Sequence, residues 1–289
     1  VEVRALPILA FGDATGDGRA DISYYREESM GVFEQRPDGT FGTKTGFDLA
    51  AEKRKRHNTF LKFEVPPWID DFDGDRIQDI GLIYPSKGRV HLFYGRPGRT
   101  DFTTPDEVKK VSEGWSTGVH PCDLTGDGKP DFVMGVIRKF GIMGGLEVFL
   151  SGKIELELHV YLMEAGGRYS KDPAQELKFS IPIAFQVTRS SATVDLTFRP
   201  TLAGDLNGDG LKDMLVAADL KTLHVYFGDK KRGLSEKVGS RLSITPPEGT
   251  IRIEPFLADF NGDGRADLIL KYVNLDEQRH TLEALLSIK

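Results

Sequence analysis

Short apolar runs alternate with polar, glycine-rich stretches along the whole chain, and helical periodicity is nearly absent. Five of these runs are rich in aliphatic and aromatic residues and lie at wide intervals, at 22–25, 80–84, 132–136, 214–217 and 268–270. Nearly continuous apolar runs of this length are typical of strands that are buried on both faces. The pattern therefore predicts an all-β protein.

The same nine-residue acidic motif precedes each of these runs. The five copies are loop 1 (13–21), loop 2 (71–79), loop 3 (123–131), loop 4 (205–213) and loop 5 (259–267), and positions are counted from the first aspartate of each loop. A second strand follows, often ending in an aromatic residue and a glycine, as at 90–95 and 223–228. A repeat of about 55 residues with this content fits one four-stranded blade of a β-propeller.

The repeat predicts a single propeller domain over residues 1–289, with five recognisable repeats and five to seven blades. The interval between loops 3 and 4 is longer than the others, which indicates an insertion around 138–187, either an added hairpin or a shrunken blade without a metal loop. The last repeat leaves room for three strands before Lys289. Closure of the ring then needs a further strand. One interpretation is that the chain is part of a longer protein.

The spacing of the acidic residues predicts a cation site in each loop. Side chains at positions 1, 3, 5 and 9 can turn toward one centre, and a backbone carbonyl at position 7 completes a set of oxygen ligands. Calcium accepts about 6–8 such oxygens, whereas magnesium needs stricter octahedral geometry and retains water. No cysteine or histidine occupies these positions, which argues against zinc and copper. Up to five Ca²⁺ ions are therefore expected.

The predicted ligands follow the same five positions in every loop. They are Asp13, Thr15, Asp17, Arg19 and Asp21; Asp71, Asp73, Asp75, Ile77 and Asp79; Asp123, Thr125, Asp127, Lys129 and Asp131; Asp205, Asn207, Asp209, Leu211 and Asp213; and Asp259, Asn261, Asp263, Arg265 and Asp267. Threonine at position 3 of loops 1 and 3 is a weaker ligand than aspartate or asparagine. Glycine at position 4 of every loop, and at position 6 of four, suits a turn that needs positive φ angles. Arg76 is the exception at position 6.

The loops and the strands after them resemble the FG-GAP/VCBS repeat family, whose calcium loops also occur in the propellers of integrin α-subunits. The resemblance covers nearly all of residues 5–289. It implies a β-propeller whose cation loops join the first two strands of each blade, with largely structural calcium ions on one face. An EF-hand is excluded, because that loop needs a glutamate at position 12 and this chain has apolar or aromatic residues there.

Composition narrows the possible functions. The net charge of −6 argues against a general nucleic-acid binder. No apolar run is long enough for a membrane-spanning helix, and the single Cys122 excludes an internal disulfide. Val1 in place of a methionine indicates a processed or trimmed product.

The leading hypothesis is a non-enzymatic recognition or assembly module that is secreted, periplasmic or at the cell surface. Loops of this kind in extracellular modules bind calcium in the range of about 10⁻⁴–10⁻³ M, which matches calcium concentrations outside cells. Protein partners are expected, within an envelope or extracellular assembly in which the chain could also be a purely structural subunit. The alternative is a carbohydrate-binding module or a calcium-dependent polysaccharide lyase, with Trp68 and Trp115 stacking on sugars.

Two further motifs are interpreted as not catalytic. Residues 114–118 match the G-x-S-x-G elbow of hydrolases, but that elbow requires a strand–turn–helix context and a strand is expected here. The basic run at 53–57 could bind an acidic surface, a phosphate or a sulfated glycan, although a solvated loop is favoured. No enzymatic activity is expected.

Overall fold

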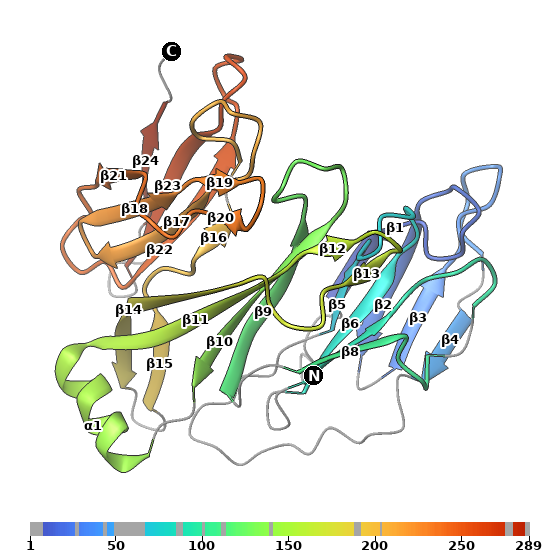
Figure 1. Ribbon diagram of the computed structural model, residues 1–289, viewed down its shortest axis with the longest axis horizontal. Coiled ribbons are helices and arrows are strands. Elements are labelled where there is room, and N and C mark those ends of the chain that lie inside the picture. Colours follow the sequence, from blue (N-terminus) through green and yellow to red (C-terminus); the bar gives the residue numbers. More distant parts are fainter. Residues whose placement is uncertain are drawn as a thin grey trace.

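Five main antiparallel sheets follow one another in chain order in the computed structural model, and together they form a five-bladed β-propeller arrangement (Figure 1). The structure describes residues 8–26, 29–42, 45–48, 67–84, 89–99, 102–110, 114–138, 141–187, 192–202, 204–274 and 280–286. The predicted all-β propeller of four-stranded blades is confirmed, and five blades lie within the expected range. Blade 1 and blade 5 lie at opposite ends of the arrangement.

Blades 1, 2 and 4 each have four strands in consecutive order, with the acidic loop between the first and second strands. Blade 1 contains β1 (Ile8–Gly12), β2 (Asp21–Arg26), β3 (Ser29–Phe33) and β4 (Thr45–Asp48). Blade 2 contains β5 (Trp68–Asp70), β6 (Asp79–Tyr84), β7 (Arg89–Phe93) and β8 (Glu107–Lys110). Blade 4 contains β16 (Thr201–Leu202), β17 (Met214–Asp219), β18 (Thr222–Tyr226) and β21 (Ser240–Ser243), with a small hairpin of β19 (Gly228–Asp229) and β20 (Gly233–Leu234) before β21. The described residues of blade 5 form β22 (Arg252–Ala258), β23 (Asp267–Val273) and β24 (His280–Leu285).

Blade 3 is the largest blade and contains residues 138–187. Its sheet has the order β15-β14-β11-β10-β9, formed by β9 (Gly114–Cys122), β10 (Asp131–Arg138), β11 (Lys153–Tyr161), β14 (Gln175–Val187) and β15 (Ala192–Leu196). A short hairpin of β12 (Met163–Glu164) and β13 (Arg168–Tyr169) follows β11, and helix α1 (Ile142–Ser151) connects β10 to β11. The helix was not anticipated, and it ends at Gly152, whose φ of 64° gives the left-handed C-terminal cap that glycine favours.

The hydrophobic core consists of four layers, one between each pair of consecutive blades. Each layer combines side chains from both neighbours: Met30 and Val32 with Ile80 and Leu82, Phe72 and Tyr94 with Phe132 and Tyr161, Leu156 and Leu158 with Met214 and Val216, and Leu215 and Leu223 with Leu268 and Leu270. An inner strand therefore serves two layers at once. In β10, Phe132 and Met134 pack toward blade 2 while Val133 and Ile137 pack toward blade 4, which explains why its sequence is apolar without alternation.

The acidic loops make direct contacts from one blade to the next. The Gln78 N–H of loop 2 donates to the Asp13 carbonyl of loop 1 at 2.7 Å, and the equivalent Ala266 N–H of loop 5 donates to the Asp205 carbonyl of loop 4 at 2.7 Å. The glycine at position 4 lies against the following loop. A Cβ on Gly126 would lie 2.8 Å from Leu211 Cδ2, so any larger residue would push the blades apart.

The residue at position 2 of loops 1 to 4 also packs against the next blade. Phe72 and Leu124 are fully buried in the layers after blades 2 and 3, and Ala14 and Leu206 are partly buried in the layers after blades 1 and 4. Phe260 in loop 5 is 52% exposed, and no blade follows it in the described part of the chain.

Phe72 and Phe260 form a matched pair for measuring this interblade packing. Phe72→Ala is expected to lower the free energy of unfolding by about 3–5 kcal/mol, because it opens a cavity between two blades. Phe260→Ala removes the same atoms from a half-exposed position, and is expected to change stability by no more than about 0.5 kcal/mol. Urea titrations at low protein concentration compare the two, and equal losses would show that position 2 does not contribute through the interblade layer.

Candidate metal centres

The aspartate at position 1 organises the turn in every loop. In loop 2 the Asp71 Oδ1 atom accepts the Gly74 N–H at 2.7 Å and its Oδ2 atom accepts the Arg76 N–H at 2.9 Å. The corresponding bonds from positions 4 and 6 to position 1 recur in the other four loops. This carboxylate therefore closes the turn through backbone N–H groups.

Position 6 shows why glycine dominates the loops. The four glycines there have φ between 82° and 87°, and Arg76 adopts φ 71° in the same left-handed region. A side chain in that region costs on the order of 1 kcal/mol. The Arg76 N–H still makes the bond to Asp71, so loop 2 keeps the shared geometry in spite of the larger residue.

The aspartate at position 9 is buried in every loop, with at most 1% of its surface exposed in all five copies. The Asp79 Oδ2 atom accepts the Phe72 N–H at 2.6 Å, and its Oδ1 atom accepts the Gly95 N–H at 2.5 Å. Gly95 follows β7, so this carboxylate connects the start of the loop to the end of the third strand. The same link is made by Asp21 to Gln35, Asp131 to Met163 and Asp213 to Gly228.

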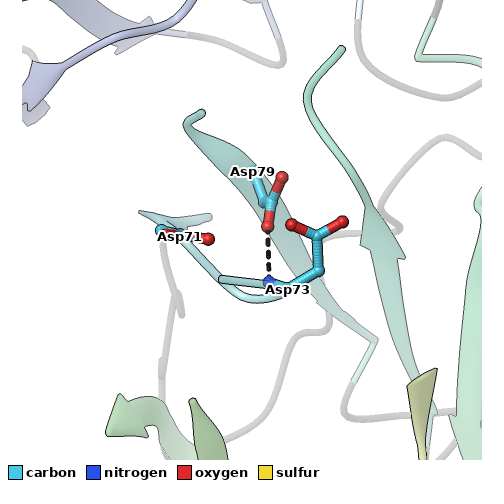
Figure 2. A group of neighbouring side chains, drawn as sticks. All are labelled: Asp71, Asp73 and Asp79. Atoms are coloured by element: carbon cyan, nitrogen blue, oxygen red, sulfur yellow. Dashed lines mark hydrogen bonds between the residues drawn. The ribbon is translucent and has the colours of Figure 1, made fainter. Parts of the chain in front are cut away.

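Loop 2 brings three carboxylates together (Figure 2). Asp71, Asp73 and Asp79 each offer one oxygen, and these oxygens all lie within 4.8 Å of one another. Two oxygens that bind one Ca²⁺ at about 2.4 Å can be separated by at most twice that distance, so the three residues fit a single calcium ion. Within the described residues this is the only group of three histidine, cysteine or acidic side chains that meets that separation.

The other loops offer mixed oxygen sets because position 3 is threonine or asparagine. Thr15 Oγ1 lies 3.2 Å from Asp21 Oδ2 in loop 1, and Thr125 Oγ1 lies 3.3 Å from Asp131 Oδ2 in loop 3. Positions 3 and 9 thus converge in these loops as they do in loop 2. All of these donors are hard oxygen ligands, which suit Ca²⁺.

Positions 5 and 7 have additional structural roles. The Asp75 Oδ1 atom accepts the Ile77 N–H at 2.8 Å, and the same bond from position 7 to position 5 occurs in all five loops. The side chains of Ile77 and Leu211 are buried and lie under the position-4 glycine of the preceding loop. At position 7 the backbone carbonyl oxygen, and not the side chain, is therefore the group that could bind a cation. Binding of a cation by this carbonyl stays a prediction.

Arg96 is a neighbour of loop 2 that sequence reasoning missed. Its Nη1 atom lies 3.2 Å from Asp73 Oδ2 and 3.7 Å from Asp75 Oδ2. It follows β7 in a turn that returns to the loop, and the only signal in the sequence is its place directly after Gly95. This guanidinium partly balances the acidic cluster, and a cation at the centre would compete with it for Asp73.

Burial is the largest influence on the pKa values of three of the position-9 aspartates. Without a cation, burial and then the charges of Asp73 and Asp71 raise the pKa of Asp79 to about 8, although N–H donors oppose the shift. Burial likewise raises the pKa values of Asp131 and Asp213. At the exposed end of loop 1, burial acts in the same direction, but four backbone N–H groups outweigh it and lower the pKa of Asp13. A divalent cation would favour the ionised form at every one of these positions.

The other candidate residues from the sequence do not assemble into a second centre. Ser116 of the elbow-like segment lies within strand β9 and pairs with Val136, so the strand–turn–helix context of a hydrolase elbow is not formed there. Trp68 is partly buried and packs against the layer between blades 2 and 3. The basic run at 53–57 lies outside the described residues. No helix of the described residues is both long and apolar enough to cross a membrane.

Comparison with known proteins supports the repeat assignment. Residues 71–134 and 205–270 match the FG-GAP-like repeat family. Each match begins at a position-1 aspartate and ends in the strand that follows the next acidic loop, β10 in the first match and β23 in the second. The two matches therefore support an FG-GAP-like repeat as the unit of this propeller. A search of curated proteins finds no match.

Solved structures that are similar to this chain include the following three. A chain of the Photorhabdus luminescens Tc holotoxin pore has a TM-score of 0.50 and 19% identity, over 98% of this chain and 11% of that chain. A Bacteroides thetaiotaomicron endo-arabinase gives 0.45 and 12%, over 97% and 98% of the two chains. An Agrocybe aegerita lectin gives 0.38 and 15%, over 97% and 80%. At this identity the first likeness shows the fold alone, and the other two carry no argument. The chain spans about a tenth of the toxin chain's length.

Asp79→Asn tests the structural part of position 9. The amide NH₂ would face a backbone N–H at one of the two oxygen positions, so a buried donor loses its acceptor. The expected loss is about 1–3 kcal/mol in the free energy of unfolding, measured after removal of metal. Asp75→Asn is the matched control, because the asparagine oxygen can still accept the Ile77 N–H, and its effect should stay within about 0.5 kcal/mol. If Asp79→Asn and Asp75→Asn lower the free energy of unfolding equally, the structural role assigned to position 9 would be contradicted.

The pH dependence of the same variant tests the burial of Asp79. Its folded pKa of about 8 lies above the ordinary 3.8, so the folded state holds the proton more tightly than the unfolded chain. This stabilising contribution is complete below pH 3.8 and is lost as the pH rises through about 8. After removal of metal, the difference in melting temperature between the wild type and Asp79→Asn should therefore shrink from pH 5 to pH 8. With calcium the difference should grow instead, and a constant difference in both conditions would contradict this assignment.

Proposed function

We propose that this chain is a calcium-stabilised propeller module that acts outside the cytoplasm by docking to another macromolecule and not by catalysis. The supporting observation is the convergence of Asp71, Asp73 and Asp79, with oxygens within 4.8 Å of one another, in a loop that also forms a contact between blades. The same donor pattern is repeated in every blade. These features favour cations that fix the scaffold over cations that take part in a reaction.

A bound calcium ion would act on the part of the structure where blades meet. Loop 2 contacts blade 3 through Gly74, where a Cβ would lie 3.1 Å from Pro130, and it contacts loop 1 through the Gln78 N–H. The ion would neutralise carboxylates that otherwise repel one another next to these contacts. Its role in this proposal is to hold adjacent blades in a fixed relation, which leaves the connections between strands free to carry recognition.

The extracytoplasmic location belongs to the same proposal. Sites built from carboxylates, amides and hydroxyls on short exposed loops suit calcium affinities of about 10⁻⁴–10⁻³ M, which are met outside cells and not in the cytosol. Carbohydrate binding remains the alternative function. Trp68 is partly buried against the core, so it offers only part of its ring for stacking on a sugar, and a protein partner is the favoured ligand.

The proposal predicts a large effect of calcium on stability. A cation that binds only the folded state stabilises it by about 2.7 kcal/mol per site when its concentration is a hundred times the dissociation constant. Several filled loops should therefore raise the melting temperature by many degrees in calcium relative to a chelated sample. Metal analysis of the calcium sample is expected to give between one and five ions per chain.

Two controls make this measurement specific. Magnesium at the same concentration should give a smaller shift, because it requires octahedral geometry and keeps its water. Asp73→Asn in loop 2 should reduce the calcium-dependent shift, measured against the chelated melting temperature of the same variant, because it removes one of the three converging carboxylates. An absence of bound metal together with an unchanged melting temperature would overturn the calcium part of the proposal.

A further inference from the structure

Loop 2 carries more acidic side chains at its ligand positions than the other four loops. Positions 1, 3, 5 and 9 are all aspartates in loop 2, whereas position 3 is threonine or asparagine in the others. Asp71, Asp73 and Asp79 each bring one oxygen to within 4.8 Å of the others (Figure 2). Carboxylates at this separation repel one another when they are ionised, so a positive charge nearby would stabilise the loop when it holds no metal.

A positive charge reaches this cluster from outside the loop. The Nη1 atom of Arg96 lies 3.2 Å from Asp73 Oδ2 and 3.7 Å from Asp75 Oδ2. In loop 3, by comparison, Lys129 Nζ at position 7 lies 3.5 Å from Asp127 Oδ2 at position 5. Arg96 differs because it pairs with position 3, where the carboxylate is one of the three that converge.

The turn that carries Arg96 is held in place by both neighbouring loops. The Gly95 N–H donates to Asp79 Oδ1 at 2.5 Å, which ties the residue before Arg96 to position 9 of loop 2. On the other side, a Cβ on Gly16 of loop 1 would lie 2.8 Å from Pro97 Cγ. The guanidinium itself donates to the Gly95 carbonyl at 2.9 Å. These contacts hold the positive charge beside loop 2 without any contribution from a metal.

The exposure of the ion pair shows that it can be exchanged. The Arg96 side chain is 47% exposed, whereas the Asp73 side chain is 10% exposed. A half-exposed guanidinium regains water when it leaves its partner, so an ion pair of this kind contributes only modestly to stability. Calcium bound by the three converging carboxylates would take Asp73 from Arg96 and would also repel the guanidinium. The two cations therefore compete for one carboxylate.

We propose that Arg96 is a built-in counter-cation of loop 2, which stabilises the loop when it is empty and lowers its affinity for calcium. The inference rests on the calcium binding of the proposed function and identifies a residue that sets the strength of that binding. Coupling between two binding events is reciprocal, so the stability that Arg96 gives to the empty loop is subtracted from calcium binding. Loop 2 therefore keeps its turn when calcium leaves, and exchanges the ion more readily than its four carboxylates alone would allow.

Arg96→Gln removes the positive charge and keeps a side chain of similar length. Calorimetric titration of the metal-free chain with calcium chloride measures the affinities. The lost ion pair and the lost repulsion together predict that one site binds calcium about three- to tenfold more tightly than in the wild type at low salt. The difference should shrink at high salt, because salt screens charges that are exposed to solvent. The same variant should melt below the wild type in chelator but not in excess calcium, whereas the loss of a purely structural contact would lower both melting temperatures.

Arg168→Gln is the matched control for the loss of one positive charge. The guanidinium carbon of Arg168 lies 5.3 Å from the centre of the Tyr94 ring, and that of Arg96 lies 5.7 Å from the same ring. Arg168 Nη1 donates to the Asp106 carbonyl at 2.7 Å, so its hydrogen bond does not involve a carboxylate of loop 2. Calcium affinities of this variant should stay within about twofold of the wild type, because a solvent-exposed charge that is not paired with a ligand is largely screened.

A double-mutant cycle in chelator tests the ion pair without calcium. Arg96→Gln should lower the melting temperature less in an Asp73→Asn background than in the wild type, because the partner carboxylate is already gone. Equal losses in both backgrounds would overturn the inference. Calcium affinities that Arg96→Gln leaves unchanged, or that Arg168→Gln raises equally, would also overturn it and would leave the calcium binding of the proposed function intact. Absence of calcium binding in the wild type and in every variant would overturn both, so the two failures can be told apart.

Discussion

Blades 1 to 4 each depend on one buried aspartate whose two oxygens are tied to different parts of the backbone. Asp79 accepts N–H groups from the start of loop 2 and from the residue after β7, so a single side chain fixes the turn between the first two strands against the end of the third. A carboxylate is suited to this role because it accepts several hydrogen bonds and donates none. Its burial would be costly in isolation, and these bonds offset part of that cost.

The same short loop also determines how blades stack. The glycine at position 4 allows the next blade to approach closely, and the apolar side chain at position 2 fills the layer between the blades. A cation centred on positions 1, 3 and 9 would therefore act on residues that already carry the interblade contacts. Stability, cation binding and blade geometry are coupled because they share one nine-residue segment, and the surrounding strands provide a rigid frame.

The terminal blades show what happens where this stacking ends. Loop 5 has the same acidic motif and the same turn hydrogen bonds as the other loops, yet its Phe260 is half exposed while Phe72 at the same position is buried. The difference in burial comes from the presence or absence of a following blade and not from the loop itself. Repeat proteins bury their faces by stacking on adjacent repeats, and an end repeat keeps an apolar face until something caps it.

The sequence by itself determined the all-β class, the blade as the repeating unit and the acidic positions that converge in loop 2, because short-range spacing and the positive φ of glycine set the shape of each loop. It did not determine the double role of position 9, since the contact between Asp79 and Gly95 joins residues from separate strands. Arg96 beside Asp73 and helix α1 in blade 3 were also decided by tertiary structure. Whether Phe72 or Phe260 is buried depends on the blade that stacks against it, which no local pattern contains. The physical reason is that loop geometry is local, whereas burial and charge pairing depend on segments brought together only when the blades pack.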